Sequence, residues 1–148
     1  MAEKSTAACL FCSIARGEMQ ASIVRETDSV LAIMDIQPVN PGHVLVIPRA
    51  HATYLAELEA KVGGEIFQLA MQVAAGLRRS GLRCEGVNLF LADGEVAGQE
   101  VFHVHLHVFP RFEDDGFGLR FGPGYGERPA RVDLDRVAAS LKAAMEKS

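Results

Sequence analysis

The chain has 148 residues, of which 49% are hydrophobic and 23% are charged. This length and composition predict one globular domain with its own hydrophobic core, and they exclude an intrinsically disordered chain. A formal net charge of −4 argues against binding to nucleic acid or membrane through a general basic surface. Residues 1–20 lack the apolar core of a signal peptide and no apolar stretch reaches the length of a membrane span, so we expect a soluble, cytoplasmic protein.

The first third of the chain predicts a short helix followed by strands. Residues 10–16 are expected to form the helix, which Gly17 ends. Apolar runs bounded by turn formers then indicate three strands, at 22–26, 29–36 and 43–49.

The rest of the chain predicts a long helix, two more strands and a terminal helix. Apolar residues recur at intervals of three and four from Thr53 to Arg79, with Gly63 and Gly64 as a point of interruption. After it we expect strands at 86–94 and 102–110, a Gly- and Pro-rich loop at 112–131, and a helix at 133–147 with Asp133 as its N-cap. This order predicts a single α+β domain, 1–148, with an antiparallel sheet of about five strands and the long helix packed across it.

The segment "FHVHLHVFP", residues 102–110, places His103, His105 and His107 at alternate positions. On a strand this spacing puts the three imidazoles on one face and apolar side chains on the other. One strand histidine is usually a half-exposed polar residue, but three in register indicate a functional site. The pattern alone leaves two kinds of site open: a metal site, or a nucleophilic imidazole with two partners.

A second motif, "CLFC", contains Cys9 and Cys12, whereas Cys84 stands apart from other cysteines in the sequence. In a reducing cytoplasm a CxxC pair is more often metal-binding or redox-active than a structural disulfide. A redox motif would normally follow a strand inside a βαβ unit, and no strand pattern precedes this pair. The remaining alternative to a metal site is a pair of reduced core cysteines.

Several segments, in this order, resemble the histidine triad (HIT) superfamily of nucleotide-binding hydrolases and transferases. They are "FCSIARGE", "LAIMDIQPVNPGHVLVIPRAH" and "VNLFLADGEVAGQEVFHVHLHVFP", the last of which contains the signature "HVHLHVF". The likeness covers a core of about 9–110 and all five histidines. It is greatest to the branch of purine nucleoside phosphoramidases and small bacterial HIT proteins.

The resemblance implies cleavage at the α-phosphate of purine nucleoside 5′-phosphoramidates or related nucleotide conjugates. His105 would be the nucleophile that forms a nucleotidyl-histidine, and His107 would contact the α-phosphate. His103 would complete the triad. The resemblance also implies a homodimer in which two sheets join.

The resemblance further assigns nucleotide-binding residues. Asp35 would accept hydrogen bonds from the ribose hydroxyls. Asn88 and Gln99 would contact the phosphate, and Gly98 would let the backbone approach it closely. The purine would lie in a slot of apolar residues: Leu10, Phe11, Ile14, Ile33 and Ile36.

Zinc-bearing members of the superfamily imply a metal site, and we expect no organic cofactor. The corresponding residues are Cys9, Cys12, His51 and His103, a Cys₂His₂ set suited to a closed tetrahedral Zn²⁺ site of structural type. The triad would then be divided, with His103 for the metal, His105 for attack and His107 for phosphate.

Some features leave the activity open. Glu100 stands where phosphoramidases of the animal type have a serine suited to giving the leaving amine a proton, and the roles of His43 and of the loop 112–131 are not defined. A dinucleoside polyphosphate hydrolase and a non-catalytic purine-nucleotide sensor are the alternative functions. An RNA contact through residues 116–131 is disfavoured by the acidic net charge.

Overall fold

A computed structural model describes residues 8–147 of the chain. Its centre is one five-stranded sheet in the order β1-β2-β3-β5-β4, in which every neighbouring pair is antiparallel. The strands are β1 (Ile23–Glu26), β2 (Val30–Met34), β3 (Val44–Pro48), β4 (Gly86–Phe90) and β5 (Leu106–Arg111). The predicted α+β architecture with an antiparallel sheet of about five strands is confirmed.

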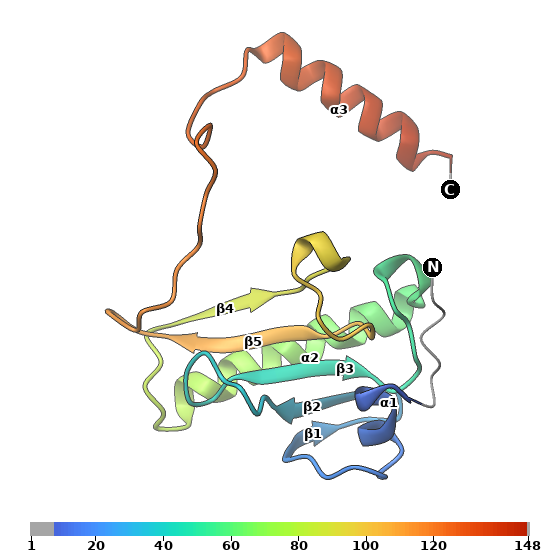
Figure 1. Ribbon diagram of the computed structural model, residues 1–148, viewed down its shortest axis with the longest axis vertical. Helices are drawn as coiled ribbons and strands as arrows, with labels where there is room; N and C mark the ends of the chain where they lie inside the picture. Colours follow the sequence, from blue (N-terminus) through green and yellow to red (C-terminus); the bar gives the residue numbers. More distant parts are fainter. Residues whose placement is uncertain (1–7, 148) are drawn as a thin grey trace. The chain divides into compact units, whose positions relative to one another are not determined.

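Two helices accompany this sheet (Figure 1). The long helix α2 (Ala60–Arg79) packs along one face, against β2, β3 and β5, and the short helix α1 (Leu10–Ala15) lies by the β1 and β2 end. Two single-turn 3₁₀ helices, η2 (Leu55–Glu57) and η3 (Glu95–Ala97), lie in the connecting loops.

The sheet is covered on both faces, which explains the continuous apolar runs of β2 and β3. Alternate residues of these strands face α2, including Val30, Ala32, Val44 and Val46, and they form one core with Ile66, Leu69, Val73, Leu106 and Val108. The residues between them form a second core with Phe11 of α1, which contains Leu31, Ile33, Leu45 and Ile47.

The long helix differs from its prediction at its start. It begins at Ala60 instead of Thr53, because Leu58 and Glu59 adopt extended backbone conformations after the turn η2. The predicted interruption at Gly63 and Gly64 is wrong, since both lie inside α2. Tertiary packing of the apolar face supplies most of the stability of such a helix and outweighs the low helix propensity of two glycines.

The histidine segment is also only partly a strand. β5 begins at Leu106, so the prediction of a strand over 102–110 is wrong for its first four residues. There the backbone N–H of His103 donates to the carbonyl of Val101 at 2.9 Å, and that of Val104 donates to the carbonyl of Ala52 at 2.8 Å. These bonds replace a sheet ladder and turn the chain before it enters β5.

Strand β4 ends at Phe90, and the turn predicted at the end of the segment 86–94 follows it. The Asp93 carboxylate accepts a hydrogen bond from the backbone N–H of Leu55 at 2.9 Å, and Gly94 has a φ of 106°. A side-chain acceptor and a left-handed glycine both end regular pairing.

The described residues form two compact units, and the second begins at Gly118. It contains helix α3 (Arg131–Met145), which begins two residues before the predicted helix. Ala130 is at the N-cap position, and the predicted cap Asp133 instead lies in the first turn, paired with Arg136. No residue of α3 is buried, and its apolar side chains Leu134, Val137 and Leu141 are exposed.

Within residues 8–147, no helix is both long enough and apolar enough to cross a membrane.

Candidate active site and metal cluster

A cavity of about 580 Å³ opens on the α1 side of the sheet. His105 and His107 line it, and so does Glu100. The other predicted site residues on its wall come from α1, the end of β2 and the loop after η3: Leu10, Phe11, Ile14, Ile33, Asp35, Ile36 and Gly98. The fold thus brings nine predicted site residues, far apart in the chain, to one cavity.

The tautomer of His105 follows from one hydrogen bond. Its Nδ1 lies 2.7 Å from the carbonyl oxygen of His103, and a carbonyl only accepts, so Nδ1 carries the proton. The lone pair is therefore on Nε2. The ring is 7% exposed and packs edge-on against Phe11, with 5.2 Å between ring centroids. A buried, oriented imidazole with a free nitrogen lone pair is suited to nucleophilic attack.

His43 and His107 form a relay whose proton positions are also determined. The backbone N–H of Val39 donates to Nδ1 of His43 at 2.9 Å, so the proton of a neutral His43 is on Nε2. That Nε2 lies 2.9 Å from Nδ1 of His107 and 3.4 Å from the Asp35 carboxylate. When Nδ1 of His107 accepts this bond, its own proton is on Nε2, which becomes a donor for a ligand in the cavity.

Burial keeps this relay neutral. Desolvation, followed by the neighbouring rings of His105 and His43, lowers the pKa of His107 to about 4. Desolvation also lowers the pKa of His43, and in both cases the nearby Asp35 carboxylate opposes the shift. Asp35 itself accepts a hydrogen bond from the backbone N–H of Gln37 at 2.8 Å, which orients its carboxylate at the cavity wall.

The amide side chains of Gln99 and Asn88, which were predicted to contact phosphate, make other hydrogen bonds. Both hydrogens of the Gln99 amide are used, on the carbonyls of Thr53 (2.8 Å) and Val101 (3.2 Å), and its oxygen accepts from Gly94 N–H. The Asn88 oxygen accepts from Arg111 at 2.6 Å. Neither residue lines the cavity. Gln99 instead braces the loop that carries Gly98, and phosphate contacts from both amides stay predictions.

The predicted metal ligands form a second cluster. The donor atoms of Cys9, Cys12, His51 and His103 lie within 4.8 Å of one another. Nδ1 of His103 is 3.5 Å from the sulfur of Cys9, 3.5 Å from that of Cys12 and 3.2 Å from Nδ1 of His51. A tetrahedral zinc site requires about 3.5 Å between sulfur and nitrogen and about 3.3 Å between two nitrogens. The donor set therefore fits a tetrahedral ion.

The chemistry of the cluster supports the same interpretation. Nε2 of His103 lies 2.8 Å from the Pro48 carbonyl, so it carries the proton and Nδ1 presents a lone pair to the cluster. Burial lowers the pKa of His103 to about 4, which keeps the ring neutral, as a ligand must be. Burial and the neighbouring Cys9 raise the pKa of the Cys12 thiol to about 11, so a cation is needed to stabilise thiolates there.

Sequence reasoning left His43 without a role, although it had singled out the segment that contains it. The role of His43 depends on the hydrogen bond from the Val39 N–H and on the position of its ring beside β5. β5 is close in the sheet but distant in the sequence. The histidine pattern alone could therefore find the site but not its fourth imidazole.

Comparison with known proteins identifies the family of the chain. A profile of the HIT domain matches residues 16–114. The chain belongs to the HIT family. HIT proteins form a superfamily of nucleotide-binding proteins and hydrolases, so the predicted recognition is confirmed at that level.

Three similar proteins illustrate the relationship. An uncharacterized HIT-like protein of Borreliella burgdorferi is 41% identical over 77% of this chain and 83% of its own. The structure of a histidine triad nucleotide-binding protein from Candida albicans has a TM-score of 0.82 and 27% identity, covering 95% of this chain and 99% of that one. A Zn-bound histidine triad family protein from Mycobacterium smegmatis has a TM-score of 0.73 and 32% identity, covering 97% and 99%.

Proposed function

We propose that this HIT protein hydrolyses purine nucleoside 5′-phosphoramidates at the α-phosphorus, through a nucleotide attached covalently to His105. The observation that carries the proposal is the 2.7 Å hydrogen bond from Nδ1 of His105 to the His103 carbonyl. It leaves Nε2 unprotonated in a cavity where the neighbouring His107 is a hydrogen-bond donor. A nucleophile beside a group that stabilises developing negative charge is the arrangement that phosphoryl transfer needs.

In the proposed first step, the Nε2 lone pair of His105 forms a bond to phosphorus and the P–N bond to the amine breaks. The amine leaves with that electron pair and takes up a proton from bulk water, while Nε2–H of His107 donates to a phosphoryl oxygen. In the second step, water attacks phosphorus, the N–P bond breaks and its electron pair returns to Nε2. The attacking water loses a proton to bulk water, which replaces the one taken up by the amine, and a nucleoside monophosphate is released.

The cavity wall supports a nucleoside as the bound group. Phe11 and Ile33 are 4% and 2% exposed and give the slot a rigid apolar floor, whereas Ile36, 90% exposed, lies at its rim. A planar base gains from such burial by the hydrophobic effect. The Asp35 carboxylate, on the same wall, is suited to accept bonds from two ribose hydroxyls.

The charges of the cavity favour an amine over a polyphosphate as the leaving group. Among the described residues that line it, Asp35 and Glu100 carry negative charge and none is a lysine or arginine. A polyphosphate leaving group would meet carboxylates with no fixed cation to compensate its charge. We therefore favour phosphoramidates over dinucleoside polyphosphates.

We also propose that Cys9, Cys12, His51 and His103 hold one structural Zn²⁺. The spacing of the donor atoms and the Zn-bound relative from Mycobacterium smegmatis support this assignment. The ion, when bound, would supply the positive charge that two thiolates need and would tie α1 to the segment before β5. With four protein ligands, the ion would have no open position and would take no part in the attack on phosphorus.

A homodimer is a further part of the proposal. β4 is an edge strand of the sheet, and its residues Leu89 and Phe90 are 39% and 44% exposed. On α2, Phe67 and Met71 are 56% and 59% exposed. An apolar edge strand is a template for pairing with another chain, here the same strand of a second copy. Light scattering at micromolar concentration should give the mass of a dimer.

The experiment for the activity is incubation with adenosine 5′-phosphoramidate and detection of AMP. Wild type should release AMP, and His105→Ala should lose nearly all turnover while still binding AMP, because the rest of the cavity remains. Gln68→Ala, at an exposed position of α2, is the control and should behave as wild type. A wild-type protein that binds AMP but releases none from the phosphoramidate would instead be a nucleotide-binding module.

A further inference from the structure

The far wall of the cavity is aromatic. Ring neighbours establish its position: Phe11 contacts His105, whose centroid is 5.0 Å from that of His107. Beyond His107, the rings of Phe90 and Phe109 lie 5.9 Å from His107 and 5.0 Å from His43, respectively. Phe117 follows at 5.2 Å from Phe109 and also lines the cavity. The two histidines of the proposed reaction therefore lie between two aromatic ends.

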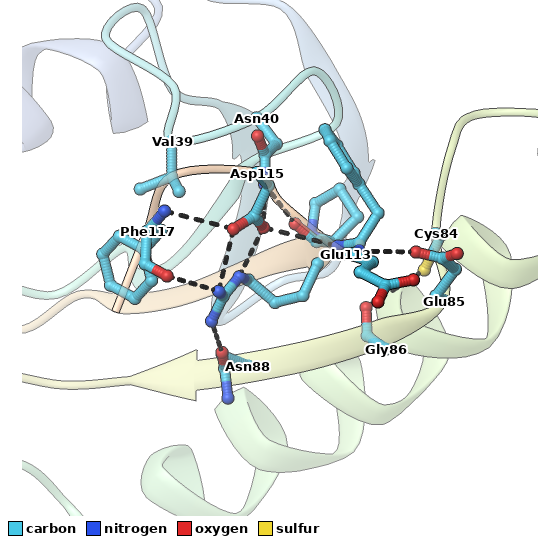
Figure 2. Close-up of polar contacts among 12 residues, drawn as sticks. Val39, Asn40, Cys84, Glu85, Gly86, Asn88, Glu113, Asp115 and Phe117 are labelled. Atoms are coloured by element: carbon cyan, nitrogen blue, oxygen red, sulfur yellow. Dashed lines mark hydrogen bonds and ion pairs between the residues drawn. The ribbon is translucent and has the colours of Figure 1, made fainter. Parts of the chain in front are cut away.

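Phe117 is held in place by an ionic clamp, although it follows a strand end in a Gly-rich segment. The side chain of Asp115, 2% exposed, accepts two hydrogen bonds from Arg111, at 2.6 and 2.9 Å, and one from the backbone N–H of Phe117 at 3.1 Å. Asn40 donates to the same carboxylate at 2.9 Å. Figure 2 shows these bonds converging on Asp115.

Arg111 completes the clamp from the other side. Its Nη2 donates to the Phe117 carbonyl at 2.7 Å, and its guanidinium lies 4.7 Å from the centre of the Phe117 ring. Hydrogen bonds from Arg111, Asn40 and two backbone N–H groups keep the pKa of Asp115 well below its usual range, so the clamp is ionised at neutral pH. Both the backbone and the ring of Phe117 are thus positioned before any ligand binds.

This aromatic wall is pre-positioned, and its neighbouring cation, Arg111, is paired with Asp115 and does not line the cavity, so the wall is suited to one kind of ligand group. Aromatic rings pair with other rings by offset or edge-to-face packing, which adds to the gain from burial. A phosphate or carboxylate would gain nothing from the carbon surfaces of Phe109 and Phe117. The base is assigned to the Phe11 end of the cavity, so the group at the Phe117 end is the one on the opposite side of the phosphorus.

We propose that Phe90, Phe109 and Phe117 form a subsite for an aromatic ring carried by the leaving amine. The proposal rests on the proposed function, because it names the class of phosphoramidate that the same cavity prefers. Phe117 is the specificity-determining residue of this subsite, and Asp115 is a positioning residue that acts through it.

The test compares three substrates that differ in the leaving amine: adenosine 5′-phosphoramidate, its N-benzyl derivative and its N-cyclohexylmethyl derivative. Wild type should show the highest kcat/KM for the benzyl compound. Phe117→Leu should lower the benzyl preference over the unsubstituted compound by about 2–10-fold, the range expected for one aromatic pair. Asp115→Asn should lower it in the same direction. Phe112→Leu is the control, because the Phe112 ring lies 4.2 Å from the Arg83 guanidinium and does not line the cavity.

Equal effects of Phe117→Leu on all three substrates, or no preference for benzyl in wild type, would overturn the subsite. The dissociation constants of the three intact compounds are measured in a His105→Ala background, where no turnover consumes them. If no phosphoramidate is hydrolysed by wild type, the proposed function fails, and these binding constants still decide the subsite. Tighter binding of the benzyl compound that Phe117→Leu abolishes would support it, and equal binding would refute it.

Discussion

Nε2 of His43 lies 2.9 Å from Nδ1 of His107, and the backbone N–H of Val39 determines the direction of the hydrogen bond between them. Because Nδ1 of His43 accepts the hydrogen bond from Val39, the ring proton of His43 is on Nε2 and points to His107. His107 must then present its own proton on Nε2. A backbone amide four residues before His43 thus controls the protonation pattern of a ring on the neighbouring strand.

We predict that His43→Phe lowers kcat for adenosine 5′-phosphoramidate by about 10–100-fold, the loss typical of removing a partner that orients a functional imidazole. KM should change little, because His43 contributes one edge of the cavity and not its apolar slot. Steady-state kinetics measures both constants. His43→Gln retains an amide donor and should recover part of kcat; a Gln variant no better than the Phe variant would contradict the relay.

Acidification should destabilise the protein through His107. Its pKa is about 4 when folded and about 6.5 when unfolded, so between these values the unfolded chain binds a proton that the folded chain does not. The free energy of unfolding should therefore decrease on acidification, by about 2 kcal/mol from this group between pH 7.5 and pH 5.

Urea unfolding at the two pH values measures this loss. In His107→Gln the position no longer titrates, so the loss on acidification should be smaller than in wild type by about that amount. The same loss in both proteins would show that His107 is protonated equally in the folded and unfolded chains.

Removal of one proposed zinc ligand should release the metal. Elemental analysis of wild type purified without added metal should find about one zinc ion per chain, as a four-ligand site requires. Removing a residue that only hydrogen-bonds to a metal ligand typically weakens metal binding by about 10–100-fold. Cys9→Ser removes a ligand itself, so it should weaken zinc binding by more than this and should lower the melting temperature. Hydrolysis at His105 need not be lost.

Cys84→Ser is the matched control for the metal. Cys84 lies outside the cluster and donates to the carbonyl of Gly86, so its variant should keep the zinc. Wild type that carries no metal and has the same melting temperature with and without a chelator would refute the site.

Gly42, directly before His43, should not tolerate a side chain. Its φ is +105°, and an added Cβ would lie 3.0 Å from side-chain carbons of both Leu77 and Leu82. Backbone strain and overpacking together should destabilise Gly42→Ala by about 2–4 kcal/mol in urea unfolding.

Gly17→Ala provides the comparison, because Gly17 also has a positive φ of +74° but nothing lies within 4 Å of its added Cβ. It should cost only the backbone term, about 1–2 kcal/mol. Equal costs at the two positions would mean that Leu77 and Leu82 move aside freely.

Much of the fold follows from local sequence patterns. The apolar runs of β2 and β3 and the three-and-four spacing of α2 identified these elements, because buried faces impose a period on the sequence. The starts of α2 and β5 were not predictable in this way. Both depend on contacts from distant segments, such as Asp93 with Leu55 and Ala52 with Val104.

The candidate site was likewise predictable from the sequence only in part. His105, His107 and the cysteine pair stand in short motifs, so the sequence points to them directly. Gln99 and Asn88 stand next to these motifs too, but their amides are engaged by Thr53 and Arg111, which no local pattern reveals. The Phe117 clamp was missed for the same reason, since Asn40 and Asp115 meet only in the folded chain.

The order of the strands has a consequence for how the protein folds. β1, β2 and β3 follow one another along the chain, and β4 and β5 pair directly, but the β3–β5 junction joins residues as far apart as His43 and His107, 64 positions. Closing so long a loop is slow compared with forming the local pairings. We expect the two parts of the sheet to form early and to join late. The imidazole relay spans that junction, so recovery of activity during refolding should coincide with the slowest step of sheet assembly.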